Sequence, residues 1–387
     1  MKLKIDKQKF MKCWNLAARC AGTANMTNSI FGSVLLVAEY DNVELRATDI
    51  RTSIVCKGDG VEVLEPGAAA FPVHRVSDLF DKAQGDFVVD VTDGKAVLTA
   101  GKSRSRFSTF PVDQFPKLPL SDAARLFCSV KAGDLCLALG KGTLCADVKA
   151  NYPPYLSSAC FDLSEKGLSI VTTDKRRLAI CRIDTDSAGD PDLLLLPMAG
   201  VRELHKVLGS VANDADVRIV RDDSQVYFLT DDFEHAIRLS DGKMPNYERI
   251  LVGDVISSID VDKESIVSAM ERVNVVVYDF NRVGCLKQSA GENMLLFGRA
   301  AEFGESVEHV PSLLEGKEVF TAFNSRFFLE AVKAVDGKVV NLVLQDKTPG
   351  IIISAKDSDS FRYLVALVEV DRDAQELIDS LELIAEA

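Results

Sequence analysis

The sequence has few of the residues and motifs from which most catalytic and metal centres are built. Its 387 residues include one Trp and four His, and no spacing among the His suits a metal pair. The G-x-S-x-G, G-x-x-x-x-G-K-[ST] and H-E-x-x-H motifs of hydrolases, nucleotide-binding loops and metalloproteases are all missing. We therefore predict a protein that is not an enzyme and binds no metal or cofactor, although catalytic groups far apart in the sequence remain an alternative.

Paired cysteines and long apolar segments are missing as well. The nine cysteines include no C-x-x-C pair and most have apolar neighbours, which is typical of buried free thiols in a reducing compartment. The most apolar stretch, residues 193–201, is too short to span a bilayer. Charged residues interrupt the amino-terminal segment where a secretory signal would have its apolar core. We expect a soluble cytoplasmic protein with no membrane partner.

The overall charge is acidic. Lys and Arg number 45 against 58 Asp and Glu, which gives a net charge of −13. This excludes a uniformly basic nucleic-acid coat but leaves room for a local basic face. The contents of 47% hydrophobic and 27% charged residues are typical of a folded protein, and the length suggests two or three domains.

A strand followed by a helix recurs three times along the chain. After Ile5, Val130 and Val261, apolar residues stand at positions +5 and +9 each time. A second unit repeats at about the same offset of 125 residues, with apolar residues at +5, +8 and +12 after Phe71, Leu196 and Phe323. This spacing is typical of the buried side of an amphipathic helix. Two different features that share one offset indicate a threefold internal repeat.

Strand-like segments rich in Val, Ile and Leu lie between the expected helices. We therefore predict an α+β fold of three repeated domains, each with two helices and about eight strands. The helices are expected over residues 7–19, 74–84, 131–149, 201–208, 263–272 and 324–338. The domains are expected over residues 1–122, 123–252 and 253–370, followed by an acidic tail over 371–387.

Four segments resemble motifs of a known family. Residues 101–111 (G-K-S-R-S-R-F-S-T-F-P), followed by Phe115-Pro116, resemble its S-R-F-x-x-x-T-L-P…F-P stretch. Residues 173–179 (T-D-K-R-R-L-A) resemble T-D-G-H-R-L-A, residues 241–250 resemble D-G-R-F-P-D-Y-R-R-V, and residues 322–324 match a G-F-N unit. The family is the bacterial DNA polymerase III beta subunit, the replicative sliding clamp. With the threefold repeat, the resemblance covers about residues 1–370.

The resemblance implies the DNA-clamp fold and a role in DNA replication. Each chain would supply half of a six-domain ring, and a head-to-tail homodimer would close around double-stranded DNA with its helices lining the hole. The protein would be a non-catalytic processivity factor that tethers replicative and repair polymerases. Its partners would be DNA polymerase subunits and the clamp loader, which bind a peptide pocket. The alternative is a clamp-like paralogue with altered or lost partner binding.

A ring can hold DNA by topology, so its phosphate contacts can be weak and non-specific. The six expected helices carry about +7 together, in contrast to the acidic remainder of the chain. Solvation of helix faces by lysines is the alternative explanation. The DNA-binding residues that we predict are Lys7, Lys9, Lys12, Arg19, Lys149, Tyr155, Arg202 and Lys206.

The family's motif positions also predict a partner pocket and a dimer interface. An apolar cleft edged by arginines would suit a peptide with hydrophobic anchors and a polar end. The implied pocket residues are Leu156, Thr173, Arg177, Leu178, Pro245, Arg249, Ile250, Leu364, Leu367 and Val368. For Leu178 and Ile250, the alternative to a role in the pocket is that each is an ordinary core residue. At the dimer interface, Phe107 would meet a helix near Val275 and Val276 of the other copy.

The sequence departs from the family at the pocket loop and at the carboxyl end. Lys175-Arg176 replace the family's Gly-His, and Asn25 stands at the place of a DNA-contacting Arg. From Glu369 to the end, the chain carries about −6. Leu377, Ile378, Leu381 and Ile384 would form one apolar stripe on a helix. Two hypotheses follow: the tail docks over or beside the partner pocket and competes with peptides, or it packs on the third domain away from the pocket.

Overall fold

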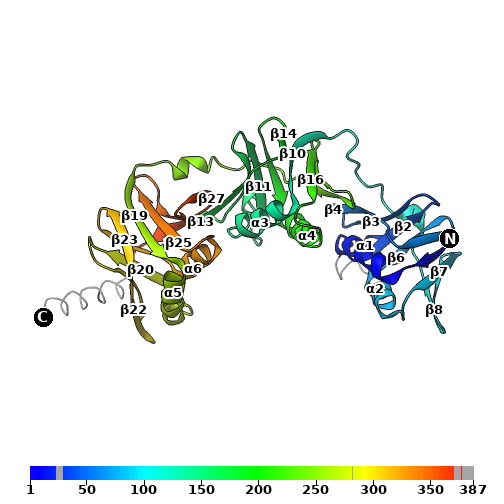
Figure 1. Ribbon diagram of the computed structural model, residues 1–387, viewed down its shortest axis with the longest axis horizontal. Helices are drawn as coiled ribbons and strands as arrows, with labels where there is room; N and C mark the ends of the chain where they lie inside the picture. Colours follow the sequence, from blue (N-terminus) through cyan, green and yellow to red (C-terminus); the bar gives the residue numbers. More distant parts are fainter. Residues whose placement is uncertain (23–28, 281, 370–375, 377–387) are drawn as a thin grey trace. The chain divides into compact units, whose positions relative to one another are not determined.

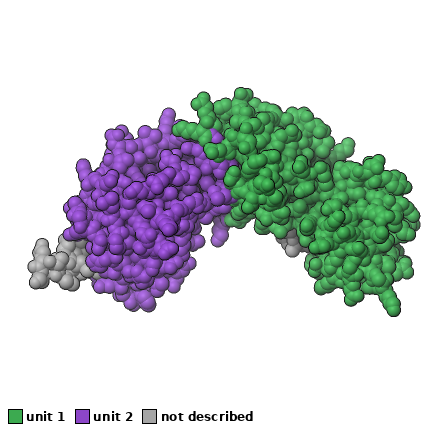
Figure 2. All heavy atoms as spheres, in the orientation of Figure 1, with its two compact units in different colours: residues 1–136, 163–166, 184–240 green, residues 137–162, 167–183, 241–387 purple. Residues whose placement is uncertain are grey.

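The computed structural model of the protein describes residues 1–22, 29–280, 282–369 and 376. It contains two compact units (Figure 2). Unit 1 consists of residues 1–136, 163–166 and 184–240, and unit 2 consists of residues 137–162, 167–183 and 241–387. Residue Asn25 and the tail, apart from Glu376, lie outside the described residues.

Unit 1 is built on two antiparallel sheets (Figure 1). The first has the order β5 (Val61–Glu65), β1 (Lys2–Ile5), β7 (Phe87–Thr92), β8 (Lys95–Ala100) and β9 (Ser103–Ser108). The second has the order β14 (Ser187–Ala188), β10 (Arg125–Lys131), β16 (Asp216–Arg221), β17 (Gln225–Leu229), β18 (Phe233–Arg238), β4 (Thr52–Lys57), β3 (Val43–Thr48), β2 (Ser33–Ala38) and β6 (Gly67–Pro72). Pairing of β18 with β4 joins segments from two sequence repeats in one sheet.

Unit 2 is also mainly antiparallel sheet. One path of strands runs β11 (Ser158–Ser164), β12 (Gly167–Thr173), β13 (Arg177–Ile183), β27 (Ser358–Val368), β24 (Val319–Asn324), β20 (Val283–Gln288), β21 (Met294–Ala300) and β22 (Gly304–Val310). A second set contains β19 (Val255–Asp262), β23 (Ser312–Gly316), β25 (Val339–Gln345) and β26 (Gly350–Ala355). The second set joins the path where β26 pairs with β27.

The described residues include six α-helices, two for each sequence repeat. They are α1 (Lys7–Arg19), α2 (Val73–Lys82), α3 (Ala132–Gly142), α4 (Met198–Leu208, after β15, Asp192–Pro197), α5 (Lys263–Val277) and α6 (Ser325–Ala334). The repeated apolar positions are the core, since Phe10, Trp14, Leu135, Ile266 and Met270 are fully buried. The predicted α+β class and the repeated arrangement of helices are therefore confirmed.

Several helix ends differ from the prediction by a few residues, and those of α3 and α5 differ most. Helix α3 ends at Gly142 because the Thr172 hydroxyl donates to the Gly142 carbonyl at 2.7 Å and β12 leaves no room for a side chain there. The predicted site residue Lys149 consequently lies in a loop, where it is exposed. Helix α5 continues to Val277 instead of 272 because Val273, Val276 and Val277 are buried. Packing outweighs the low helix propensity of these β-branched residues.

Local capping explains where several helices begin. The Asp6 carboxylate accepts a hydrogen bond from the Lys9 amide at 3.1 Å, and the Asp262 carboxylate accepts one from the Ser265 amide at 2.9 Å. These aspartates precede α1 and α5 at equivalent places in the repeat. A capping carboxylate satisfies amides that have no partner in the first helical turn.

Most cysteines are buried, as the sequence predicts. Eight cysteines are buried and Cys136 is half-buried, all of them as free thiols. No helix in the described part of the chain has both the length and the apolar character that crossing a bilayer requires.

Candidate functional site

Most of the predicted pocket residues gather around one strand pair in unit 2. Strands β13 and β27 pair antiparallel, with Leu178 opposite Leu364 and Arg177 opposite Val365 (Figure 1). Leu178 and Leu364 are 3% and 6% exposed, so they form part of the interior. For Leu178 this agrees with the alternative of an ordinary core position.

The turn before β13 is held by its own side chains. The Asp174 carboxylate accepts hydrogen bonds from the Arg176 amide at 2.9 Å and the Arg177 amide at 3.0 Å. The Thr173 hydroxyl donates to the Arg177 carbonyl at 2.7 Å. Lys175 adopts φ 73°, the left-handed conformation that favours glycine. The turn leaves the Lys175 and Arg176 side chains exposed.

Arg177 is bound inside unit 2 and does not form an open edge. Its Nε donates to Asp174 at 2.8 Å, and its Nη1 donates to Glu330 at 2.5 Å and to the Tyr363 hydroxyl oxygen at 3.0 Å. The guanidinium carbon also lies 4.1 Å from the centre of the Phe327 ring. Because its side chain is only 11% exposed, Arg177 does not form the open edge of the cleft that we expected.

The electrostatics of this cluster follow from its burial. Desolvation raises the pKa of the Tyr363 hydroxyl, and nearby Cys145 and Glu330 raise it further. Desolvation alone would lower the pKa of Arg177, but Tyr363, Asp174 and Glu330 outweigh it and the pKa is raised. Arg177 therefore stays charged, and its charge is balanced within the protein.

A second group of predicted pocket residues is exposed. Ile250 is 39% exposed, and Leu367 and Val368 are each 40% exposed. The Ile250 carbonyl accepts a hydrogen bond from the Thr348 hydroxyl at 2.9 Å. The Leu367 amide donates to the carbonyl of Pro349, which follows Thr348 in the chain, at 3.1 Å. The backbones of Ile250 and Leu367 are thus held to consecutive residues, and the side chain of each is exposed.

The segment that carries Pro245 and Arg249 is anchored by the buried Tyr247 side chain. Tyr247 is 7% exposed, and its hydroxyl donates to Asp162 at 2.5 Å. Desolvation and this hydrogen bond raise the pKa of Tyr247. Pro245 and Arg249 remain exposed, whereas Leu156 is 7% exposed and belongs to the core. The sequence motif contained Tyr247, but only the fold identifies its partner Asp162.

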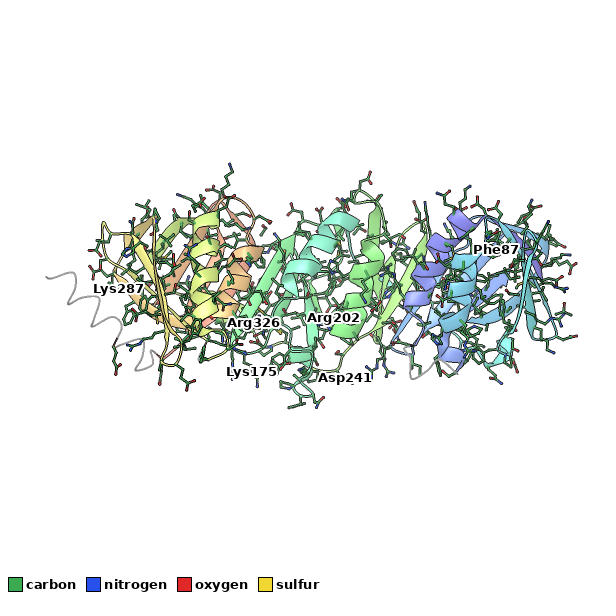
Figure 3. All side chains as sticks on the ribbon, turned by 90° about the horizontal axis from the view of Figure 1, so that it is seen from below. Phe87, Lys175, Arg202, Asp241, Lys287 and Arg326 are labelled. Atoms are coloured by element: carbon green, nitrogen blue, oxygen red, sulfur yellow. The ribbon has the colours of Figure 1, made fainter. Side chains whose placement is uncertain are left out.

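Four of the predicted DNA-binding residues are exposed on two helices of unit 1, three on α1 and one on α4. Helix α1 packs on β3 and β4, and α4 packs on the neighbouring strand β18. Helix α1 buries Phe10, Cys13, Trp14 and Ala17. The exposed residues of α1 include Lys9, Lys12 and Arg19. Helix α4 exposes Arg202 (Figure 3).

Other predicted DNA-binding residues have partners or lie apart from these helices. The Lys7 ammonium donates to the carbonyls of Asp81 and of Ala83, where α2 ends, so it caps that helix. The exposed Lys206 is 2.8 Å from Glu203. Tyr155, on the short segment Pro154–Ser157 of unit 2, is half-buried.

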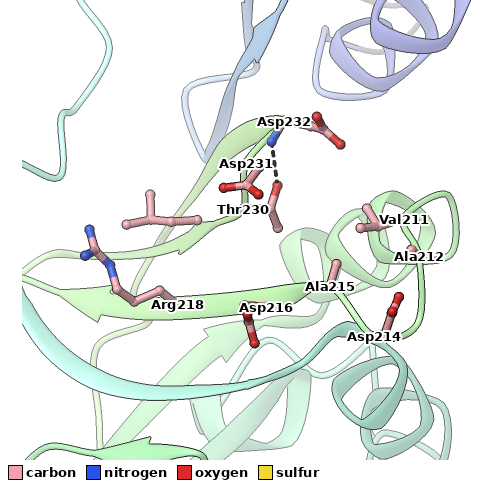
Figure 4. A pocket seen from close by; sticks show the side chains of 10 residues that line it. Val211, Ala212, Asp214, Ala215, Asp216, Arg218, Thr230, Asp231 and Asp232 are labelled. Atoms are coloured by element: carbon pink, nitrogen blue, oxygen red, sulfur yellow. Dashed lines mark hydrogen bonds between the residues drawn. The ribbon is translucent and has the colours of Figure 1, made fainter.

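A cavity of about 630 Å³ in unit 1 has the opposite charge (Figure 4). Four aspartates and Arg218 contribute to its wall. The Asp232 amide donates to the Thr230 hydroxyl at 3.3 Å in the same wall. An acidic wall does not suit DNA phosphates. Among the described residues, no three His, Cys, Asp or Glu side chains are grouped as metal ligands.

The predicted dimer residues differ in exposure. Phe107 is half-buried on β9, 6.2 Å from Phe71 between ring centres, and borders a cavity of about 520 Å³. In unit 2, Val275 is 70% exposed, whereas Val276 is 8% exposed and packs with Val277 and Ala300. Val276 therefore packs within its own unit, and Val275 is the exposed member of the predicted pair.

An aromatic pair lies near Val275. Phe280 and Phe303 stack with ring centres 6.1 Å apart, and they are 44% and 62% exposed. No sequence periodicity predicts this pair, since the two residues belong to separate turns. Val275, Phe280 and Phe303 thus add exposed apolar side chains to the end of α5 and to the β21–β22 turn, which also exposes Glu302.

Comparisons with known proteins agree with this architecture. Family models of the three domains of the DNA polymerase III beta subunit match this chain in order. The N-terminal domain matches residues 1–119, the central domain residues 141–246 and the C-terminal domain residues 249–369. The chain is 25% identical over 368 residues to the beta sliding clamp of Pseudomonas putida, covering 94% of this chain and 99% of that protein. Identity to the Escherichia coli beta sliding clamp is 24% over 371 residues, covering 94% and 99%.

Solved structures give the same result for the fold. The Bacillus subtilis sliding clamp matches with a TM-score of 0.89 and 21% identity, covering 96% of this chain and 100% of that one. The Pseudomonas aeruginosa DNA polymerase III subunit beta matches with a TM-score of 0.87 and 24% identity, covering 95% and 100%. The expected three clamp domains are thereby confirmed. The chain belongs to the DNA polymerase III beta subunit family, the bacterial processivity sliding clamps.

Proposed function

We propose that two copies of this chain close head to tail around duplex DNA and hold DNA polymerase subunits on it, without catalysis. The observation that carries this proposal is the match between two open sheet edges. Strand β9 ends the five-stranded sheet of unit 1, and β22 ends the strand path of unit 2. An edge strand exposes unpaired backbone groups that another strand can pair with.

The two edges are complementary in charge and in apolar character. Strand β9 exposes Arg104 and Arg106, whereas the β21–β22 turn and β22 expose Glu302 and Glu305. The cavity beside Phe107 would receive apolar side chains such as Val275, Phe280 and Phe303 of the other copy. A head-to-tail contact made twice closes a two-fold ring.

The solution mass of the chain tests this arrangement. Wild type should be a dimer, and Phe107→Asp should be a monomer, because a buried carboxylate would oppose association. Leu64→Asp, on β5 at the other edge of the same sheet, is the matched control and should remain a dimer. A dimer that survives Phe107→Asp would reject this interface.

We further infer that the exposed basic residues of α1 and α4 face the DNA. A clamp held by topology needs only weak phosphate contacts, which Lys9, Lys12, Arg19 and Arg202 can supply. After loading, the ring should remain on nicked circular plasmid and slide off the linearised form. The match over three clamp domains does not favour the alternative of a divergent paralogue.

The partner site that we propose is the exposed surface formed by Ile250 and Leu367. Exposed cations lie on the segments beside it, from Lys175 and Arg176 to Arg249. A short peptide with hydrophobic anchors and acidic neighbours would fit this combination. Polymerase subunits and the clamp loader would share it. Ile250→Asp should weaken binding of a labelled clamp-binding peptide and leave the dimer intact.

A further inference from the structure

The turn between β3 and β4 in unit 1 repeats the turn before β13 in unit 2. The Thr48 hydroxyl donates to the Thr52 carbonyl at 2.7 Å. The Asp49 carboxylate accepts hydrogen bonds from the Arg51 amide at 3.0 Å and from the Thr52 amide at 2.7 Å. The equivalent groups of residues 173–177 make the same three contacts, 125 positions further along the chain. The two turns therefore share one conformation.

The strand beside each turn is held in the same way. In unit 1, the Arg238 amide donates to the Arg51 carbonyl at 2.9 Å. In unit 2, the Ala366 amide donates to the Arg176 carbonyl, also at 2.9 Å. Leu367 of the proposed partner surface directly follows Ala366. The internal repeat therefore builds the backbone frame beside that surface a second time, within unit 1.

The turn in unit 1 borders a cavity of about 300 Å³. Residues of two segments, 48–53 and 117–119, supply most of its wall, together with Gln225. The apolar side chains in the wall are Ile50, Leu118 and Pro119. Arg51 and Lys117, which also line it, are exposed cations. A cavity with this combination fits a short peptide that has hydrophobic side chains and acidic neighbours.

Ile50 is both strained and exposed. Its φ is 79°, in the left-handed region where a β-branched side chain is an outlier. The side chain is also 59% exposed, so burial within the fold does not offset the strain. Strained residues are typical of ligand-binding sites. Contact with a ligand would bury Ile50 and account for both features.

We propose that this cavity in unit 1 is a second docking site for short peptides, separate from the partner surface of unit 2. The occupant is a segment of a partner protein. Its hydrophobic side chains would contact Ile50 and Leu118, and its carboxylates would pair with Arg51 and Lys117. This inference rests on the proposed function, since it assigns the same class of peptide to the repeated frame. One chain could then bind two partner segments at the same time.

Titration of the full chain with a fluorescein-labelled peptide of leucine, phenylalanine and aspartate tests the second site. In Ile250→Asp, which disrupts the surface of unit 2, part of the binding should remain. Adding Ile50→Asp should weaken the remaining binding by about tenfold. Aspartate tolerates the left-handed conformation, so this change should leave the fold intact. Adding Tyr40→Asp instead, at the exposed turn between β2 and β3, is the matched control and should change nothing.

Amide hydrogen exchange locates the bound peptide. In Ile250→Asp, the peptide should slow exchange within residues 48–53 and 117–119. Complete loss of binding in Ile250→Asp overturns the proposal and leaves the partner surface of unit 2 in place. Remaining binding that Ile50→Asp does not weaken also overturns it. Wild-type binding that Ile250→Asp leaves unchanged and Ile50→Asp abolishes supports the site in unit 1 and rejects the surface of unit 2 instead.

Discussion

The guanidinium of Arg177 lies over the Phe327 ring, with Cζ 4.1 Å from the ring centre. Arg177 begins β13 and Phe327 belongs to α6, so the contact joins segments of two sequence repeats within unit 2. Glu330, one helical turn further along α6, accepts a hydrogen bond from the same guanidinium. Arg177 therefore fixes α6 against β13.

Loss of this guanidinium should destabilise unit 2. Arg177→Ala removes the charge that balances Asp174 and Glu330, and we expect the free energy of unfolding to fall by about 3 kcal/mol. Arg177→Lys should recover only part of it, because an ammonium cannot make the same forked contacts or stack on Phe327 in the same way. Urea unfolding measures the change.

Arg176→Ala is the matched control for Arg177→Ala. Its side chain is exposed, so the free energy of unfolding should stay within about 0.5 kcal/mol of wild type. If Arg177→Ala instead kept full stability and lost peptide binding, the prediction would be wrong. Arg177 would then belong to the peptide-binding edge that its motif position implies.

A second prediction concerns His235, on β18 in unit 1. The ring is fully buried, and neither of its nitrogens has a hydrogen-bond partner among the residues that the structure describes. Desolvation lowers its pKa from 6.5 to about 4, and Asp49 opposes this weakly. Because the unfolded chain takes up the proton first, the stability contributed by neutral His235 is complete above pH 6.5 and is lost as the pH falls toward 4. The loss amounts to about 3 kcal/mol.

His235→Leu separates this effect from general acid unfolding. The variant should lose less stability than wild type between pH 6.5 and 4 in urea unfolding. His309→Leu, at an exposed position, should follow the wild-type pH profile. Equal slopes for wild type and His235→Leu would show that another group dominates in this range.

The repeated fold could be predicted from sequence because it rests on local periodicity. Phe10, Ile266 and Met270 stand at regular spacings, and burial of each follows from the helix period. The end of α3 could not be predicted, since it depends on Thr172, 30 residues away. Propensity within the helix contains no information about that contact.

The candidate site shows the same limit. Motif position identified Arg177, and its partner Asp174 is three residues away, but its other partner Glu330 is 153 residues distant and could not be predicted from the motif. Lys7 likewise looked like part of a basic stripe, and the fold uses it to cap α2. Whether a cation is free for a ligand depends on long-range packing.

A third prediction concerns the Lys175 turn. Lys175 has φ 73°, where a side chain costs about 1 kcal/mol relative to glycine. Lys175→Gly should therefore raise the unfolding midpoint by a few degrees at most, with part of the gain offset by the freedom of glycine in the unfolded chain. Arg176→Gly, at the next position, has no such strain to relieve and should lower the midpoint. Thermal unfolding measures both, and a lower midpoint for Lys175→Gly would contradict the prediction.

The last prediction concerns the DNA path. Lys9 and Lys12 are exposed on α1, and each phosphate contact contributes about 0.9 to the slope of log affinity against log salt. Lys9→Gln with Lys12→Gln should therefore flatten that slope by about 2 for each subunit on nicked circular DNA. The paired control is Lys95→Gln with Lys166→Gln, which removes equal charge from the exposed first residue of β8 and from the exposed β11–β12 turn. Since the control changes the net charge equally, only contacts along α1 can separate the two variants. Equal slopes for both would place the DNA away from α1.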